Sequence, residues 1–249
     1  MNLLVDIGNA RIKWALQDAD SWTTGEPLPR NNRAFKDIAR PAWKELDAPE
    51  RVIVSNVAGE DYRKSVQTWV KRRWKVTPEF LPVTEQQCGV QNAYRMPQRL
   101  GADRWASLLA AHAHYRGSAV IIDCGTAITI DALGADGKHL GGLIVPGMAL
   151  MSSALTSHVP GVQIEETDHE EVSLLGCSTE AALSGGILYT AVALVERVFT
   201  DLQAELGDRT HRLLTGGDAE RIRPLLGSRP ETVPDLVLKG LAVYAQEPG

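Results

Sequence analysis

Two stretches of the chain share one alternation of apolar and polar positions. Residues 3–16 read LLVDIGNARIKWAL and residues 120–133 read VIIDCGTAITIDAL, with five identities in an ungapped alignment at an offset of 117 residues. In each stretch an apolar run ends at Asp, Gly follows two residues later, and a second strand-like run begins. Glycine permits the tight turn that this reversal needs. The pattern therefore predicts a β-hairpin at the start of each half of the chain.

The segments after each hairpin repeat one order of elements. Period-two alternation and apolar runs predict strands, and a period of about 3.6 residues predicts helices. The expected strands are residues 3–5, 11–16, 21–28, 51–57, 120–122, 128–133, 138–145 and 211–215. The expected helices are residues 31–46 with a break near Pro41, 60–74, 102–115, 178–206, 218–226 and 234–246. The order β-β-β-α-β-α, used twice, predicts an α/β protein with a mixed sheet in each half.

Length and composition fit one large globular domain or two small ones, and the repeated pattern favours two lobes. The chain has 249 residues, of which 44% are hydrophobic and 23% charged, which is ordinary for a folded protein and excludes a largely disordered one. We expect the boundary near residues 116–118, which gives lobes over residues 1–116 and 117–249. Because no low-complexity linker separates the halves, we expect a cleft between packed lobes.

Charge and cysteine content narrow the partners and the compartment. Lys and Arg number 26 against 31 Asp and Glu, and apart from the short run at residues 71–73 the basic residues are scattered. This does not favour a nonspecific nucleic-acid binder. The cysteines at 88, 124 and 177 have neither zinc spacing nor the even number of a disulfide framework. No signal peptide is recognisable, and uninterrupted apolar runs are far shorter than the ~20 residues of a membrane span. A cytoplasmic protein is expected.

The two Asp-x-Gly turns are candidate phosphate loops. Glycine lets backbone N–H groups approach an anion, while the carboxylate would act through a cation or water. A single Asp-x-Gly is most often an ordinary β-turn. Two at equivalent places in a duplicated frame favour a pair of loops that grip the phosphates of a nucleotide.

Three glycine-containing segments at expected helix starts leave two interpretations open. LLTGGDA at 213–219 permits close approach of a flat or anionic ligand, or is a plain strand–turn–helix. In GADR at 101–104, Asp103 is either a first-turn carboxylate stabilised by the helix dipole or a catalytic base beside the planar donor Arg104. In GCSTE at 176–180 a hydroxyl either caps the helix or faces a ligand.

Other features carry weaker signals. The six histidines form no ligand cluster and are interpreted as structural or solvated. Gly185 and Gly186 lie inside an expected helix, where each costs about 1 kcal/mol relative to alanine, so close packing of a neighbouring helix, for instance at a subunit interface, is expected. The acidic segment 158–171 is either a loop near the site or a solvated connection.

Taken together, the motifs resemble one family. The chain carries, in order, DIGNARIK at 6–13, Tyr94, GADR at 101–104, DCGTAITID at 123–131, GGLIVPG at 141–147, GCST at 176–179 and LLTGGDA at 213–219. This set resembles the type III pantothenate kinases of the acetate and sugar kinase/Hsp70/actin superfamily, and the resemblance spans nearly the whole chain. It implies two duplicated ribonuclease H-like (actin-like ATPase) lobes, each a mixed β-sheet with flanking helices.

The resemblance also implies an activity and a set of residues. The activity is ATP-dependent phosphorylation of the primary hydroxyl of pantothenate, the first step of coenzyme A biosynthesis, with Mg²⁺ and a monovalent cation (K⁺ or NH₄⁺), in cytoplasmic homodimers whose active sites involve the subunit interface. Asp103 resembles the catalytic base, and Asp123 resembles the monovalent-cation residue. The implied ATP-binding residues are Asp6, Ile7, Gly8, Asn9, Ala10, Arg11, Ile12, Lys13 and Thr126. The implied pantothenate-binding residues are Tyr94, Gly101, Ala102, Asp103, Arg104 and Thr179.

One position departs from the family pattern. Ala10 stands where Thr or Ser is common, so a hydroxyl near the phosphates is lost and weaker ATP binding is expected. Two rival functions are a different small-molecule kinase, which GADR and GCST disfavour, and a non-catalytic nucleotide-binding regulatory protein on the same scaffold. Turnover that depends on pantothenate distinguishes the kinase from the regulatory protein.

Overall fold

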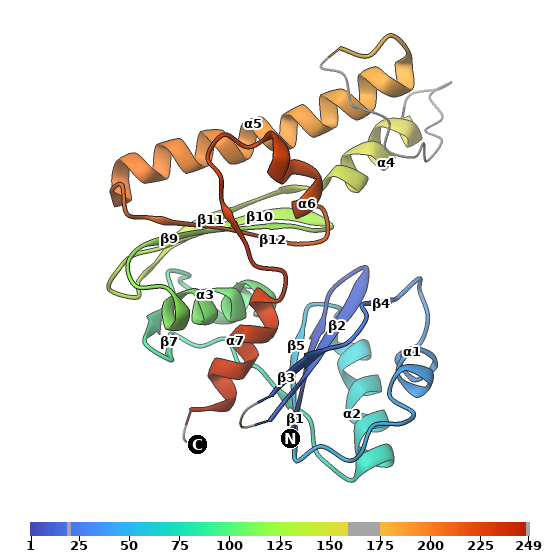
Figure 1. Ribbon diagram of the computed structural model, residues 1–249. Helices are drawn as coiled ribbons and strands as arrows, with labels where there is room; N and C mark the ends of the chain where they lie inside the picture. Colours follow the sequence, from blue (N-terminus) through green and yellow to red (C-terminus); the bar gives the residue numbers. More distant parts are fainter. Residues whose placement is uncertain (19–20, 159–174, 248–249) are drawn as a thin grey trace. The chain divides into compact units, whose positions relative to one another are not determined.

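The structure is a computed structural model that describes residues 1–18, 21–158 and 175–247 (Figure 1). Contacts divide the chain into two compact units. The first comprises Met1–Arg116, Gly137–Leu140 and Asp235–Gly249, and the second comprises Gly117–Asp136 and Gly141–Pro234. One division between the units falls after residue 116. The last helix, expected in the second lobe, belongs to the first unit instead.

The first unit is built on a mixed sheet of order β3-β2-β1-β5-β6, with β4 also pairing β2. The central strand pairs antiparallel with its hairpin partner and parallel with β5. The strands are β1 (Asn2–Ile7), β2 (Arg11–Gln17), β3 (Trp22–Thr24), β4 (Leu28–Pro29), β5 (Arg51–Asn56) and β6 (Glu79–Phe80). The single strand expected over residues 21–28 is thus two short strands. A separate hairpin, β7 (Gln86–Gln87) and β8 (Val90–Gln91), was not expected.

Four helices cover the first sheet. α1 (Phe35–Ala42) and α2 (Glu60–Trp74) pack on one face, where Leu3, Val5 and Ile7 of β1 reach them. α3 (Ala102–His114) and α7 (Leu236–Ala245) pack on each other and on β5, and α7 also contacts β1 (Figure 1). A short 3₁₀ turn, η1 (Pro97–Arg99), precedes α3. α1 is shorter than the expected helix over 31–46, and Pro41 lies in its last turn rather than at a central break.

An aromatic cluster fills the α1/α2 side of this core. Phe35 of α1 and Trp43 just after it lie 5.7 Å apart between ring centroids. Trp69 of α2 contacts both at 5.8 and 5.7 Å, and Trp74 lies edge-on to Trp69 at 5.1 Å. Edge-to-face contacts of this kind contribute about 0.5–1.5 kcal/mol each beyond the burial of area. The cluster therefore fixes α1 against α2.

The second unit repeats the central arrangement. Its sheet has the order β11-β10-β9-β12-β13, with β10 antiparallel and β12 parallel to β9. The strands are β9 (Ala119–Cys124), β10 (Ala127–Leu133), β11 (His139–Pro146), β12 (His211–Thr215) and β13 (Glu231–Thr232). In both units the Asp-x-Gly motif forms the turn of a hairpin, and the first strand of that hairpin also pairs with a parallel strand. The predicted duplicated α/β frame is confirmed.

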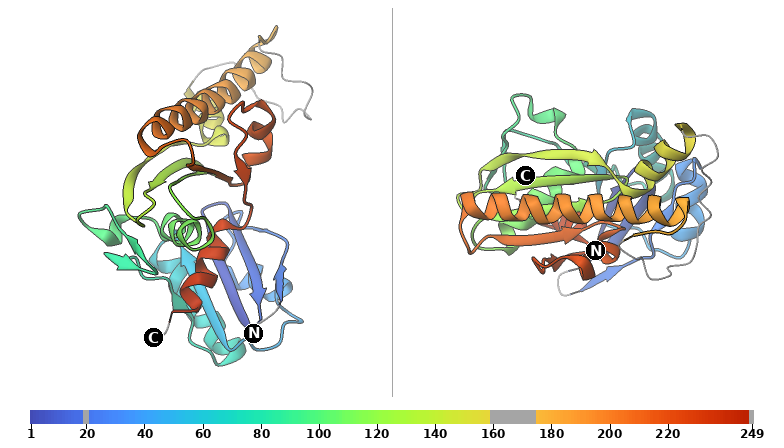
Figure 2. Two further views of the ribbon diagram at one scale, coloured as in Figure 1. Left: turned by 60° about the vertical axis from the view of Figure 1, so that its left-hand side comes forward. Right: turned by 90° about the horizontal axis from the view of Figure 1, so that it is seen from above.

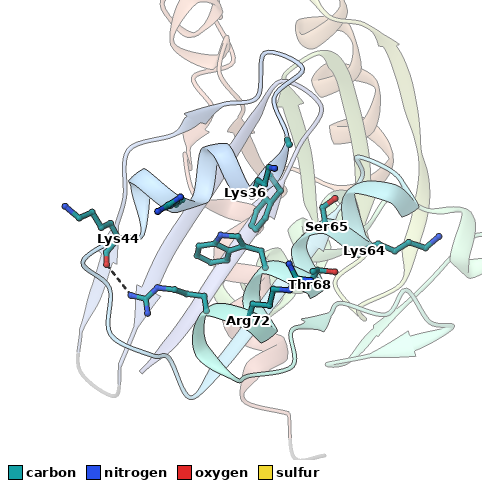
Figure 3. A pocket seen from close by; sticks show the side chains of 11 residues that line it. Lys36, Lys44, Lys64, Ser65, Thr68 and Arg72 are labelled. Atoms are coloured by element: carbon teal, nitrogen blue, oxygen red, sulfur yellow. Dashed lines mark hydrogen bonds between the residues drawn. The ribbon is translucent and has the colours of Figure 1, made fainter.

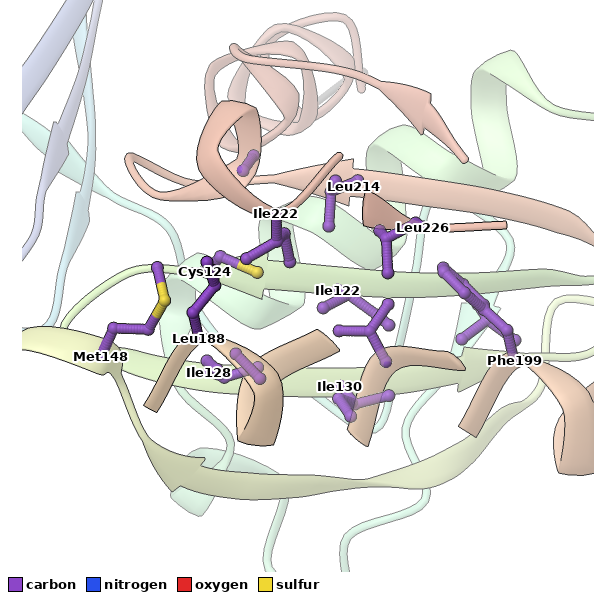
Figure 4. Close-up of a cluster of buried hydrophobic side chains, with 14 of the residues drawn as sticks. Ile122, Cys124, Ile128, Ile130, Met148, Leu188, Phe199, Leu214, Ile222 and Leu226 are labelled. Atoms are coloured by element: carbon purple, nitrogen blue, oxygen red, sulfur yellow. The ribbon is translucent and has the colours of Figure 1, made fainter. Parts of the chain in front are cut away.

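Helices cover one face of the second sheet. α5 (Thr179–Leu206) runs along it and buries Leu188, Val195 and Phe199 among strand residues such as Ile122 (Figures 2 and 4). α6 (Ala219–Ile222) continues into the 3₁₀ turn η2 (Arg223–Leu225), and both contribute to the helical region expected over 218–226. α4 (Met148–His158) was not expected. Apart from His158, the segment 158–171 lies outside the described residues.

α5 is the helix in the described part of the chain that is long and apolar enough to cross a membrane, judged by length and composition alone. Counting only uninterrupted apolar runs did not single it out. A third of its most apolar window is buried inside the protein. Core helices of water-soluble proteins also meet this criterion, and the packing of α5 on the second sheet is that of a core helix.

Candidate active site

The first Asp-x-Gly turn joins β1 to β2. Asp6 closes the buried strand at 8% exposure and lies opposite Lys13 in the hairpin register. The Gly8 N–H donates to the carbonyl of Arg11 at 3.1 Å, which closes the turn. The tip, residues 9–11, is exposed, as a phosphate loop requires. Ile7 and Ile12, included in the predicted ATP-binding set, are fully buried in the core, so their side chains support the loop and only their backbone can face a ligand.

Arg30 braces this turn, and sequence reasoning missed it. Its Nη1 donates to the carbonyls of Gly8 at 2.7 Å and Asn9 at 2.9 Å, and its backbone N–H donates to the carbonyl of Ala10 at 2.9 Å. The guanidinium also stacks 4.2 Å above the ring centroid of Tyr62. Positive charge is thus fixed at a turn that lacks the hydroxyl common at position 10. No local motif marks Arg30, because its partners lie about twenty residues earlier in the chain.

The second turn joins β9 to β10. Asp123 is half-buried at the end of β9, the Gly125 N–H donates to the carbonyl of Ala127 at 3.0 Å, and Thr126 is exposed at the tip. The Thr126 carbonyl accepts from the N–H of Gly147 at 3.0 Å. Gly147 belongs to the GGLIVPG segment, so two of the recognised motifs meet at this turn.

The glycine pair after β12 reaches the same turn. Gly216 has a φ of +100°, and a Cβ there would lie 2.5 Å from Oδ1 of Asp123 and closer still to the carbonyl of Cys124. The Asp218 N–H donates to that carbonyl at 2.9 Å. Burial, with the charges of Asp123 and Asp218, raises the pKa of Cys124 to about 12, so its thiol stays protonated. LLTGGDA forms a strand–turn–helix from β12 to α6, and its Gly216 lies close to the Asp123 carboxylate.

A third group gathers at the start of α3. Oδ1 of Asp103 accepts from the N–H of Arg104 at 2.8 Å, and a Cβ on Gly101 would lie 2.5 Å from the same oxygen. Arg104 is only 6% exposed, and its Nη1 donates to the Tyr94 hydroxyl at 2.9 Å. Ala102 supplies the first residue of the helix. The structure therefore brings together Tyr94 and the whole GADR segment, which are separated in sequence.

His139 joins this group and was not singled out by the sequence. Its ring stacks on Tyr94 with centroids 6.0 Å apart and planes 16° apart, and it is 3% exposed. The packing holds the Tyr94 ring where its hydroxyl can accept from Arg104. Thr179 is the remaining predicted substrate residue. It is exposed at the start of α5 in the second unit, where Ser178 caps the helix by accepting from the N–H of Ala181 at 3.1 Å.

Two mixed sheets, each with an Asp-x-Gly hairpin beside a parallel strand, define the class: the protein has the fold of actin-like ATPases and sugar kinases. A putative 2-dehydro-3-deoxygalactonokinase from Sinorhizobium meliloti shares this fold, with a TM-score of 0.61 at 16% identity over 99% of this chain and 96% of that one. The model of the type III pantothenate kinase family matches residues 2–201, and the chain belongs to this family.

Curated relatives agree along nearly the whole chain. A type III pantothenate kinase of Nitrosococcus oceani is 45% identical over 99% of this chain and 94% of its own length. Another, from Nitrosospira multiformis, is 35% identical over 98% of this chain and 91% of its own length. The family recognised from the sequence motifs is confirmed.

Proposed function

We propose that this protein transfers the γ-phosphoryl group of ATP to the primary hydroxyl of pantothenate, giving 4′-phosphopantothenate, the first step of coenzyme A biosynthesis. The family match over residues 2–201 carries this proposal. The clustering of Tyr94 with Gly101, Ala102, Asp103 and Arg104 supports it, because these are the residues that the family pattern assigns to pantothenate.

Asp103 acts as the base in this proposal. The N–H of Arg104 holds its Oδ1, so the start of α3 fixes the orientation of the carboxylate. Its role is to orient the pantothenate hydroxyl and accept its proton as the oxygen attacks the γ-phosphorus in line. Phosphoryl transfer depends mainly on positioning and charge stabilisation, so early proton transfer is not required. Arg104, held by Tyr94, binds polar groups of the substrate as a planar donor.

The two Asp-x-Gly turns serve ATP in this proposal. Residues 6–13 form the first phosphate loop, with Lys13 and the braced backbone around Gly8 facing the phosphates. Thr126, at the tip of the second turn, also binds ATP in this proposal. Mg²⁺ bound with ATP would supply positive charge that stabilises the transferred phosphoryl group. Arg30 supports the first loop through its contacts with the Gly8 and Asn9 carbonyls, and this partly compensates for Ala10.

Asp123 is the proposed ligand of a monovalent cation, K⁺ or NH₄⁺. Its carboxylate oxygen and the carbonyl of Cys124 both lie against Gly216, so two oxygen atoms converge at one glycine. Carboxylate and carbonyl oxygens are ligands for hard cations, and carbonyl oxygens replace the hydration shell of K⁺ in other proteins. The bound cation would neutralise negative charge near the phosphates, and Asp123 would hold it.

We further propose that the enzyme is a cytoplasmic homodimer joined through α4 and α5. A groove of about 530 Å³ between these helices is lined by apolar residues such as Leu150, Leu155 and Ile187, and Leu150 and Leu155 are exposed. Among the described residues, nothing lies within 4 Å of the position that a Cβ at Gly186 would take, so this side of α5 is open to the close packing of a second chain. Light scattering tests this: Gly186→Arg should give monomers, and Gly186→Ala should leave the dimer intact.

The decisive assay is ADP release from Mg-ATP with and without pantothenate, in potassium, ammonium and sodium buffers. Turnover that requires pantothenate and either potassium or ammonium supports both the substrate and the cation site. Folded protein that binds ATP without such turnover would favour the regulatory alternative. Equal turnover in sodium would remove the proposed cation specificity while leaving the kinase activity.

The base is tested separately. Asp103→Asn should lower kcat by about 10²–10⁴-fold, the usual contribution of a positioned acid or base. Asp61→Asn is the matched control, because Asp61 also lies in the first turn of a helix in the first unit but is exposed and outside the site. A wild-type kcat in Asp103→Asn would exclude this residue as the base.

A further inference from the structure

The first unit contains a concave site that none of the residues assigned above lines. A cavity of about 710 Å³ opens between α1 and α2 (Figure 3). This volume lies within the usual range of small-molecule sites, about 300–1,000 Å³. The lining residues are Ala34, Phe35, Lys36, Arg40, Lys44, Lys64, Ser65, Thr68, Trp69, Arg72 and Arg73. None of them belongs to either Asp-x-Gly turn or to the cluster around Asp103.

The cavity is strongly basic in an acidic protein. Six of its eleven lining residues are Lys or Arg, against 26 in the whole chain, whose net charge is −5. No acidic residue occurs among the described residues that line it. The run at residues 71–73, the one basic cluster visible in the sequence, contributes two of the six cations. The fold therefore places basic residues of α1 beside the basic residues of α2, which in the sequence form only a short run.

The cations follow the helical repeat on both sides. Residues 36, 40 and 44 recur at intervals of four on and just after α1, and Lys64, Thr68 and Arg72 recur at the same interval along α2. Side chains four residues apart on a helix are neighbours, about 5–6 Å apart at Cβ. Figure 3 shows Lys36 and Lys44 on the α1 side and Lys64 and Arg72 on the α2 side. The result is two facing rows of donors.

Protein carboxylates do not neutralise most of these cations. Among the described residues, no ion pair or side-chain hydrogen bond is formed by four of the six: Lys36, Arg40, Lys64 and Arg72. The ammonium group of Lys44 pairs with its exposed neighbour Glu45 at 3.3 Å. Like charges gathered without counter-charges repel, and a ligand anion relieves that repulsion.

The floor between the rows is aromatic. Phe35 and Trp69 line the cavity, and their ring contacts with Trp43 and Trp74 hold them in place. Phe35 is almost fully buried, while Trp69 is half-buried and leaves part of its indole at the floor. Aromatic rings stack on bases, which contributes about 1–3 kcal/mol per base in nucleic-acid complexes. The hydroxyls of Ser65 and Thr68 add neutral donors beside the indole.

We propose that this cavity is a second nucleotide site, which takes a nucleotide with two or more phosphate groups. The base lies on the accessible part of the Trp69 indole, which Phe35 supports from below, and the phosphates lie between the rows of cations. Arginine donates to phosphate in a bidentate manner and lysine supplies a point charge, so Arg40 and Arg72 orient the phosphates while Lys36 and Lys64 strengthen the field. The volume of about 710 Å³ and the concave shape favour a small molecule over a membrane surface or a nucleic-acid duplex.

Calorimetry at low ionic strength without divalent metal tests the proposal by stoichiometry. ATP should occupy two sites per wild-type chain. In Arg40→Gln/Arg72→Gln the second site should weaken by at least about tenfold, because two charge-assisted contacts are lost. Pantothenate-dependent turnover should be unchanged, because neither residue touches the proposed active site. Rising salt should weaken the second site more than the first in proportion to its exposed charges.

A matched control removes equal charge elsewhere. Lys71→Gln/Arg209→Gln changes two exposed cations, one of them on α2 itself, that do not line the cavity. It should keep both ATP sites. If Arg40→Gln/Arg72→Gln fails to fold by circular dichroism, Lys36→Gln/Lys64→Gln replaces it, with the same expected loss.

Three results would overturn the proposal. The first is one ATP site per wild-type chain, or equal weakening in the cavity variant and the control. The second is inorganic triphosphate binding as tightly as ATP, since the aromatic floor would then play no part and the site would be a plain anion site. The third is cosedimentation with vesicles of acidic phospholipid that the cavity variant alone abolishes, without a second nucleotide site.

Discussion

Replacing Gly216 by alanine tests the contact between the last glycine motif and the second turn. Gly216 has a φ of +100°, and an added Cβ would lie 2.5 Å from Oδ1 of Asp123. Alanine must therefore either move the Asp123 carboxylate or push β12 away from β9. Because Asp123 is the proposed cation ligand, the substitution should reduce both stability and activity.

The expected loss in the free energy of unfolding of Gly216→Ala has two parts. Alanine at positive φ costs about 1–2 kcal/mol of conformational free energy. Overpacking against a backbone carbonyl and a carboxylate adds about 1–3 kcal/mol, so Gly216→Ala should lower the free energy of unfolding by about 2–5 kcal/mol. Gly207 supplies the control: its φ is +93°, and a Cβ there would meet no atom of the described residues within 4 Å. Gly207→Ala should lose only the first part, about 1–2 kcal/mol.

Urea unfolding followed by circular dichroism, and ADP release at varied Mg-ATP, measure the two effects. Gly216→Ala should lose about 10–100-fold in kcat/KM for ATP, since a misplacement near 1 Å at a site can cost about 10²-fold. Gly207→Ala should keep wild-type kinetics. If the two variants were equally stable and equally active, the close approach of Gly216 to Asp123 would not exist in solution, and the assignment of Asp123 would lose its structural support.

Three further predictions concern single side chains. Arg30→Met should raise the KM for ATP about 5–30-fold, because two hydrogen bonds to the first turn are lost, and steady-state kinetics measure it. The hydrogen bond from Arg51 lowers the pKa of Glu79 from 4.5, so this pair stabilises the fold above that pH and the benefit is lost as the pH falls below it. Glu79→Gln, which keeps the hydrogen bond from Arg51 to the Ala245 carbonyl, should therefore lose less than about 1 kcal/mol at neutral pH and converge with wild type in acid, as urea titrations across pH would record. In native protein at pH near 8, iodoacetamide should alkylate exposed Cys177 while Cys124, with its pKa of about 12, stays unmodified in peptide mass mapping.

Sequence patterning predicted the duplicated frame because its signals are local. The two hairpins, α2, α3 and α5 each have a strong period or a glycine at a required turn. α4 was missed because its eleven residues, MALMSSALTSH, are apolar on several sides and carry no clear amphipathic period. The last helix was predicted as a helix, but the unit against which it packs was not predicted. The apolar residues of this helix could pack on either sheet. The glycine at position 240 is what its packing on α3 requires, because a Cβ there would meet the backbone of Ala106.

For the candidate active site too, the sequence indicated residues that belong to local motifs and missed those that act across long separations. Asp103 and Arg104 were singled out because they are consecutive in a motif, and Tyr94 because of the family resemblance; the structure brings the three together. Arg30 and His139 were missed, since each acts on residues twenty or more positions away and no spacing rule links them. The basic cavity was also invisible, because a helical interval of four on α1 looks like an ordinary solvated face until α2 is packed beside it.

The placement of α7 has a consequence for how the protein forms. The first unit cannot complete its core until Asp235–Gly249 has been made, although its other main part ends at Arg116. Synthesis runs at about 5–20 residues per second, so the nascent N-terminal sheet waits roughly 6–25 s with the surface that α7 will cover still exposed. During that interval Leu4 and the apolar side of α3 are open to chaperones and to neighbouring chains. Loss of the last fifteen residues should therefore unfold the beginning of the protein rather than its end.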